Sequence, residues 1–223
     1  MQASSFPNRD VSRLRGLGVA CPLLVSRHPD ITPRGRGVTP RGAFVDQITQ
    51  YRRAVESFRP LLAEVGDAEL TLPCPCSEWD VRALLAHTTG AQRGLASALT
   101  GPSEPLSEDP REDFEAAVET MVATFTPERI AAAIKTPFGE RTGGFLLGLA
   151  TGDIFVHAWD LARALGRSSD LDPELAEELL ERMRQTLPDA ARGEGRAFGP
   201  VQPVAPDAPA ADRLAAFTGR VVD

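Results

Sequence analysis

The 223-residue sequence has few of the features that define several large protein classes. Its three cysteines, at positions 21, 74 and 76, are too few and too clustered for a disulfide framework, which favours a reducing, cytoplasmic setting. No apolar run reaches about 18 residues, so the sequence predicts no membrane-spanning helix. A P-loop, a Gly-x-Gly-x-x-Gly motif after a strand and a Gly-x-Ser-x-Gly motif are also missing, which argues against nucleotide-binding and α/β-hydrolase chemistry.

Charge is distributed unevenly along the chain. Residues 1–42 hold seven arginines and two aspartates, a net +5, whereas the total of −7 leaves −12 for residues 43–223. The first segment is rich in Gly and Pro without apolar periodicity, which predicts a disordered basic extension. We interpret it as an upstream extension of the reading frame in preference to a targeting peptide or an arm that touches nucleic acid or anionic lipid. The acidic remainder argues against a nucleic-acid partner.

From residue 43 onward, apolar side chains recur at spacings of three and four, which is typical of amphipathic helices. In the second helix we expect Ser77 as the N-cap, His87 in the last turn and Gly90 as the stop. Pro60 is a possible kink in the first. The predicted helices span 44–65, 77–90, 111–125, 126–134, 142–166, 172–187 and 211–219. Thr126 before Pro127 and Asp172 before Pro173 are expected to be the N-caps of the fourth and sixth.

This pattern predicts an all-α fold, because no alternation of strand type competes with it. Short loops between long helices favour one domain, residues 43–223, built as an antiparallel four-helix bundle with additional short C-terminal helices. The Pro/Gly-rich segment 193–209 is expected to form an extended strap across the bundle, since only a short helix follows it.

Asp153 and His157 lie one helical turn apart within the apolar stretch "GDIFVHAWDLARALG". At this spacing the two side chains can form an ordinary hydrogen-bonded pair or supply two ligands to a metal ion. A third ligand would distinguish the alternatives. Because His28 falls in the basic extension, His87 is the only other histidine available.

Two segments, "PCSEWDVRALLAHTTG" at 75–90 and "GDIFVHAWDLARALG" at 152–166, resemble the signature helices of the DinB-like superfamily. They are most similar to its actinobacterial metal-binding branch, which is related to the N-terminal domain of mycothiol-dependent maleylpyruvate isomerase. The ending at 197–220 is similar too, and the resemblance covers about residues 44–220.

The resemblance implies a divalent metal, usually zinc, with His87, Asp153 and His157 as its ligands. The isomerase commonly has Glu at the acidic position, so the shorter Asp153 would hold the ion closer to the helix or more loosely. Three protein ligands leave an open position, as in a catalytic metal site.

Residues beside the predicted ligands have less specific roles. Cys74 and Cys76 are expected to be loop and packing residues, because about three helical turns separate Cys76 from the predicted ligand on its helix. Trp79 and Trp159 are expected to be core anchors, with Trp159 close enough in sequence to line the pocket. The next turn carries Asp160 and Arg163, which are either outer-shell partners of the metal site or an exposed ion pair.

The function implied by the resemblance is that of a metal-dependent enzyme that uses mycothiol or another low-molecular-weight thiol. The reaction would be S-transfer or isomerisation of a small electrophilic substrate. The alternative is a non-catalytic metal- or ligand-binding helical bundle with a stress or accessory role, because no general acid or base is evident beside the predicted ligands. The expected partners are the substrate and the thiol, with no nucleic acid and no membrane, and a homodimer is left open.

Overall fold

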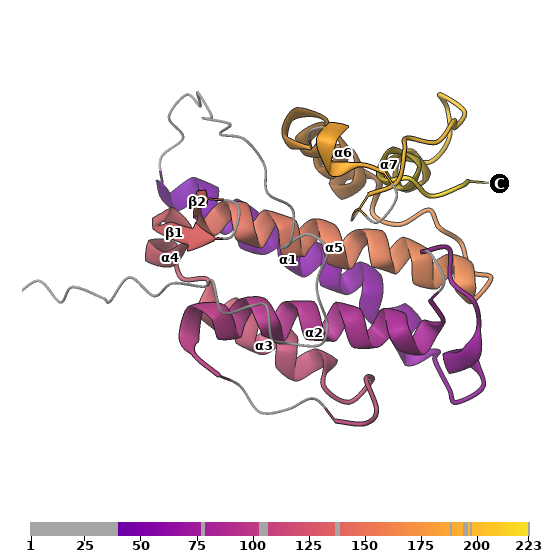
Figure 1. Cartoon of the computed structure of the whole chain (residues 1–223), viewed down its shortest axis with the longest axis horizontal. Helices are drawn as coiled ribbons and strands as arrows, with labels where there is room; N and C mark the ends of the chain where they lie inside the picture. Colours follow the sequence, from indigo (N-terminus) through magenta and orange to yellow (C-terminus); the bar gives the residue numbers. More distant parts are fainter. Residues whose placement is uncertain are drawn as a thin grey trace, which may run out of the picture.

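The computed structural model describes residues 40–76, 79–102, 107–136, 139–187, 189–193, 196 and 198–222. The predicted disordered extension therefore falls almost entirely outside the described residues, and so do Ser77 and the side chain of Phe44. The first helix begins at Pro40, so the helical region starts slightly before the predicted boundary at residue 43. The described chain is mostly helical, as predicted (Figure 1).

Helices α1, α2, α3 and α5 pack together in the body of the fold (Figure 1). Helix α5 packs along α1 and also contacts α2, while α3 packs on α2. Aromatic and aliphatic side chains from all four helices, such as Tyr51, Phe58, Leu84, Phe114 and Phe155, are fully buried between them. The bounds are α1 Pro40–Ala63, α2 Val81–Thr100, α3 Phe114–Thr124 and α5 Gly143–Ala164.

Helix α5 is the central helix of the molecule. It is long and apolar enough to cross a membrane by length and composition, yet 83% of its apolar window is buried inside the protein. The buried core helix of a soluble protein has this same character. Its apolar residues therefore have protein partners on nearly every side, and polar groups on it are buried with them.

Helix α2 differs from the prediction at both ends. It begins at Val81, with the Asp80 carboxylate accepting a hydrogen bond from the Ala83 N–H at 2.8 Å, so Asp80 is the N-cap. It continues through Gly90 to Thr100. A glycine inside a helix costs only about 1 kcal/mol relative to alanine, which burial of later apolar residues on the same helix offsets. The predicted stop was wrong, and His87 lies in the second turn of a long helix.

A short hairpin replaces the end of one predicted helix. Helix α4 covers only Pro127–Ala131, and strands β1 Ala133–Thr136 and β2 Gly139–Thr142 pair antiparallel. The expectation that the chain contains no strand was wrong, because four-residue strands are too short to show a readable alternation. The hairpin leads directly into α5, and the Thr142 hydroxyl caps that helix by accepting from the Phe145 N–H.

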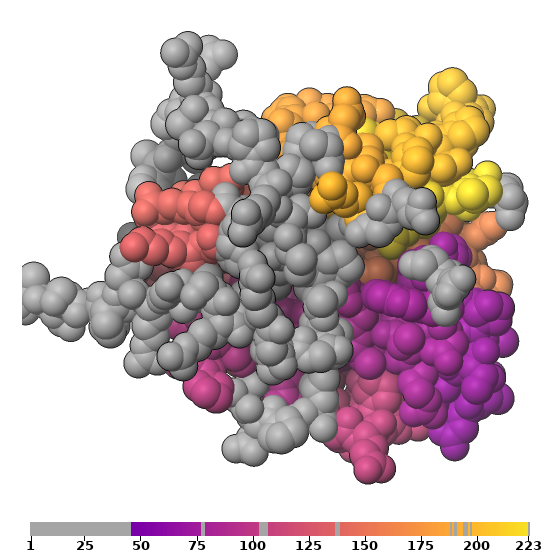
Figure 2. Space-filling view, in the orientation of Figure 1, coloured from indigo at the N-terminus to yellow at the C-terminus, as the bar shows by residue number. Residues whose placement is uncertain are grey.

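The C-terminal elements gather on one side of the molecule, drawn in orange to yellow above the indigo to magenta N-terminal helices (Figure 2). Helices α6 Pro173–Thr186 and α7 Ala210–Thr218 pack on each other, and α7 also contacts α5. The predicted capping of α6 by Asp172 is confirmed. The remaining short elements are the 3-10 turns η3 Glu69–Thr71 and η4 Asp189–Ala191.

Candidate metal centre

Helices α2 and α5 bring His87, Asp153 and His157 together in the interior. The Oδ1 atom of Asp153 is 3.3 Å from the Nε2 atom of His87 and 3.6 Å from the Nε2 atom of His157. The three residues are 4%, 8% and 7% exposed. Each offers a donor atom within 4.8 Å of the other two. The three positions named from the sequence therefore face one point.

The charge of Asp153 is only partly compensated by the protein. Its second carboxylate oxygen, Oδ2, is buried and has no hydrogen-bond partner. Burial raises the pKa of Asp153, but the hydrogen bond from His87 and the charge of His157 outweigh it, and the pKa is lowered overall. An ionised, buried carboxylate with an unpartnered oxygen is costly, so the cluster favours a cationic ligand.

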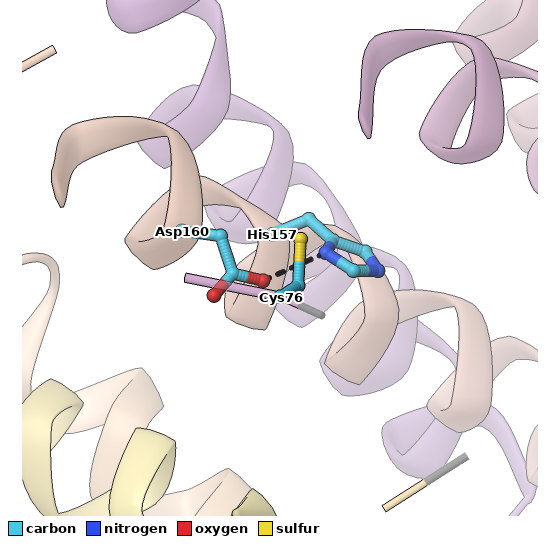
Figure 3. Close-up of side chains that lie close together, drawn as sticks. All are labelled: Cys76, His157 and Asp160. Carbon is cyan, nitrogen blue, oxygen red and sulfur yellow. Dashed lines mark hydrogen bonds and ion pairs between the residues drawn. The ribbon is translucent and has the colours of Figure 1, made fainter. Parts of the chain in front are cut away.

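On the far side of the His157 ring, Asp160 forms a second polar layer (Figure 3). Its Oδ2 atom is 2.9 Å from His157 Nδ1 and accepts a hydrogen bond from Arg220 Nη2 at 2.8 Å. Oδ1 accepts a second one from Arg220 Nε at 3.2 Å. Burial raises the pKa of Asp160, but the charge of Arg220 and the hydrogen bonds from His157 and Arg220 lower it overall.

Of the two residues expected beside the ligands, Asp160 is thus a direct partner of His157, whereas Arg163 lies over the ring of Trp159 at 5.7 Å. The sequence reasoning missed Arg220, which reaches the site from beyond the end of α7. Only its position in the matched C-terminal ending could have suggested it.

Of the two tryptophans expected to be core anchors, one takes that role and the other lines the pocket. Trp159 is a buried core residue, and its indole N–H donates to Asp212 on α7 at 2.7 Å. Trp79 lies beside the histidines, with ring centroids 4.7 Å from His87 and 6.0 Å from His157. Trp79 is therefore the tryptophan that lines the pocket, because the loop before α2 folds back over the cluster.

Cys76 lies nearer to His157 than the sequence reasoning suggested, because only its separation from His87 was considered. Its sulfur lies within 4.8 Å of donor atoms of His157 and Asp160 (Figure 3). Counting turns along α2 was misleading, because Cys76 approaches His157 on α5 across the interior and not His87 along its own helix. The expectation that Cys74 and Cys76 pack in a loop is correct, since both are buried, and their sulfurs are 2.7 Å apart.

A pocket of about 480 Å³ opens onto the cluster. Its apolar wall includes Leu149, Val156 and Met183 from α5 and α6. Its other side is formed by residues on either side of α7 and at its end, which are Gly193, Arg196, Phe198, Gly199, Thr218, Gly219 and Arg220. Phe155 and Leu161, on the same helix as Val156, are buried in the core and do not line the pocket. A small ligand in this pocket would contact both the polar cluster and an apolar surface.

Glycines keep the C-terminal wall of this pocket in place. Gly219 ends α7 in the left-handed region at φ 105°, and a Cβ atom there would lie 2.6 Å from the Cα atom of Gly199. The Gly199 N–H donates to the Thr218 carbonyl at 3.3 Å. This close backbone approach positions the residue that follows, Arg220, beside Asp160.

Comparison with known proteins agrees with this architecture. The family model for the mycothiol maleylpyruvate isomerase N-terminal domain matches residues 51–136. Two uncharacterised proteins of Mycobacterium tuberculosis, from strains CDC 1551 and H37Rv, are each 39% identical over 184 residues, which is 80% of this chain and 100% of theirs. No solved structure matches significantly. The chain belongs to the mycothiol maleylpyruvate isomerase N-terminal domain family of the DinB-like superfamily.

Proposed function

We propose that this protein binds a divalent metal ion, most simply zinc, through His87, Asp153 and His157, and that it uses the ion to act with a low-molecular-weight thiol such as mycothiol. The reaction is S-transfer to, or isomerisation of, a small electrophilic substrate. Family membership supports the thiol, and the geometry of the donor atoms supports the metal.

The separations between the donors are the observation that carries the proposal. Bonds of about 2.0–2.2 Å to a tetrahedral zinc ion separate neighbouring donors by about 3.3–3.6 Å. Asp153 Oδ1 lies 3.3 Å and 3.6 Å from the two Nε2 atoms. The second distance is too long for a hydrogen bond, and the first is longer than the usual one. The buried Oδ2 atom without a partner also favours a cation here.

The surrounding residues prepare His157 to be a ligand. The lowered pKa of Asp160 keeps its carboxylate ionised, so it accepts a hydrogen bond from the N–H at Nδ1 of His157. The lone pair of His157 then lies on Nε2, which faces the donor cluster. Arg220 neutralises Asp160 and fixes its orientation through both oxygens. Trp79 covers the two imidazoles and restricts access of water to them.

A divalent ion held by His87, Asp153 and His157 would supply Lewis acidity, which lowers the pKa of a thiol bound to it. The residues that line the pocket supply the contacts for the substrate. Leu149, Val156 and Met183 present apolar surface to the substrate, while Arg196 lines the same pocket and offers a positive charge. Substrates with a hydrophobic part are therefore favoured.

One observation favours a non-catalytic alternative, a helical bundle that binds a metal or ligand in a stress or accessory role. Apart from the three proposed ligands, the ionisable side chains among the described residues that line the pocket are Cys76, Arg196 and Arg220. None of these is an obvious general base, and Arg220 is engaged with Asp160. A reaction at this site would therefore depend on the thiol and the metal for its proton transfers.

The same proposal includes the wider expectations from the sequence. The long helices form an antiparallel DinB-like four-helix bundle, residues 43–223 form its domain, and segment 193–209 straps the bundle. The protein works in the cytoplasm, and a homodimer is compatible with this arrangement.

Titrating the cobalt-substituted protein with a thiol tests the function. Adding mycothiol or a simpler thiol is expected to produce a thiolate-to-metal charge-transfer band with release of a proton. Asp153→Asn is expected to weaken the response because it changes the charge of the ligand set, whereas Glu64→Gln, the same change on the surface, leaves it intact. A metal-loaded protein whose spectrum changes with no thiol tested but changes on addition of a small anion would favour the non-catalytic alternative.

A further inference from the structure

Two cysteine sulfurs lie in contact at the edge of the pocket, and the function proposed above uses neither. Cys74 Sγ and Cys76 Sγ are 2.7 Å apart, and both thiols are free. Each residue is 8% exposed. Cys74 is also within 3.8 Å of the Cys76 carbonyl oxygen. The pair is thus arranged so that a small approach of the sulfurs would join them.

The loop that carries the pair is held closed by its backbone. The Cys74 N–H donates to the Trp79 carbonyl at 3.0 Å, and the Val81 N–H donates to the Leu72 carbonyl at 3.0 Å. These bonds join the segment that carries the cysteines to Trp79 and to the start of α2. The same bonds connect the cysteines to Trp79, whose ring lies on the imidazoles of the candidate metal centre.

The two thiols differ in their access to the pocket. Cys76 is one of the lining residues, with Pro75 and Trp79, whereas Cys74 is not. A small molecule in the pocket therefore reaches Cys76, whereas Cys74 does not line the pocket. The hydrogen bond with Cys74 and burial raise the pKa of the Cys76 thiol, so its access to the pocket is what favours it as the first thiol to react. This is the order needed for thiol–disulfide exchange, in which one thiol is attacked or attacks first and a neighbour resolves the mixed disulfide.

Metal binding explains the position of Cys76 less well. Cys76, His157 and Asp160 form a second group with metal-ligand spacing. However, both oxygens of Asp160 already accept hydrogen bonds from Arg220, and one of them also meets His157 Nδ1. A cation there would have to displace a buried guanidinium, so Cys76 is left available for thiol chemistry.

We propose that Cys74 and Cys76 form a reversible disulfide by exchange with a low-molecular-weight disulfide that enters the pocket. The Cys76 thiolate attacks one sulfur of the disulfide RSSR, forming a Cys76–SR mixed disulfide and releasing RS⁻. The Cys74 thiolate then attacks Cys76 Sγ, forming the Cys74–Cys76 bond and releasing the second RS⁻. The two thiol protons pass to the two released thiolates, so the cysteines are oxidised by two electrons and RSSR is reduced to two RSH.

Oxidation of the pair is expected to alter the pocket wall. The new bond restrains the loop between Cys74 and Trp79, and Trp79 contacts both histidines. A change in Trp79 fluorescence should therefore accompany disulfide formation. Trp79→Phe should remove that change, because the other tryptophan, Trp159, is buried in the core with its indole N–H bonded to Asp212.

The experiment uses the full chain with Cys21→Ser, so that Cys74 and Cys76 are its only cysteines. The native protein is treated with 2-hydroxyethyl disulfide, quenched with acid and analysed by intact mass and thiol counting. The expected product has lost both thiols, is lighter by two hydrogens and carries no adduct. The test needs neither metal nor activity, so it stands or fails independently of the function proposed above.

Two matched variants test the order of attack in the same background. Cys74→Ser is expected to keep a hydroxyethylthiol adduct on Cys76, because no second thiol resolves it. Cys76→Ser is expected to react at least about tenfold more slowly, because Cys74 is not among the residues that line the pocket. Retention of both thiols in the native protein under conditions that oxidise the urea-unfolded chain would overturn the proposal. Faster reaction of Cys76→Ser than of Cys74→Ser, or a disulfide between chains, would also overturn it.

Discussion

Replacing Asp160 with asparagine is expected to destabilise the protein strongly. Asp160 is fully buried, and the side chain of Arg220 is 11% exposed. Both carboxylate oxygens accept from that guanidinium, at 3.2 Å and 2.8 Å. An amide of the same shape removes the negative charge and one acceptor, leaving a buried cation uncompensated. Breaking a buried pair in this way costs about 3–5 kcal/mol, so we expect Asp160→Asn to lower the free energy of unfolding by about that amount.

The assay is urea unfolding of the metal-free protein, so that loss of a bound ion does not contribute. Glu64→Gln is the matched control, because Glu64 makes the same kind of ion pair with Arg167 where both side chains are exposed, 42% and 57%. The control should cost less than about 1 kcal/mol. A loss of stability in Asp160→Asn no larger than in Glu64→Gln would refute the view that Asp160 anchors Arg220. Metal affinity, measured separately, should fall by about 10–100-fold, because Asp160 orients His157.

Three further predictions concern the rest of the fold. The hydrogen bond from Arg53 on α1 lowers the pKa of Asp172, so the Asp172 carboxylate contributes stability above its ordinary pKa of 3.8, and this contribution is lost as the pH falls below that value. In Asp172→Asn, the free energy of unfolding in urea should therefore depend less on pH across that acidic range. Gly219→Ala should lower the melting temperature, because Gly219 has a positive φ and a new Cβ atom there would clash with the Gly199 backbone. Gly94→Ala on α2, where nothing lies near the new Cβ atom, should instead stabilise the protein by about 0.5–1 kcal/mol. Equal effects of the two variants in calorimetry would contradict this. Deleting residues 1–39 should leave the melting temperature and metal content unchanged, because that segment has no apolar period with which to pack; a large fall in melting temperature would contradict it.

Features that depend on neighbouring residues were the ones that the sequence predicted well. Asp172 before Pro173 and Thr126 before Pro127 both cap helices as expected, because an N-cap needs only its own first turn. Asp153 and His157 face the same way because a helix places positions four apart on one face. The helical class of the chain followed from the same local periodicity.

The errors arose where a local signal competed with packing or where contacts cross the fold. Gly90 is a plausible helix stop by itself, but the apolar residues that follow it carry α2 onward. Trp79 and Cys76 approach the histidines, and Arg220 bonds to Asp160, from segments outside the two helices that carry the predicted ligands. Their positions depend on how the loop before α2 and the end of α7 fold back, which no periodicity encodes.

The metal content of purified protein tests the central proposal most directly. The full chain is incubated with zinc, desalted and analysed for metal, alongside a His87→Ala/His157→Ala double variant whose folding is checked by circular dichroism. We predict about one divalent ion per chain in the parent protein and almost none in the folded double variant, because two of three ligands are gone. Stoichiometric zinc that survives in the folded double variant, or its absence from the parent protein, would contradict the proposed site.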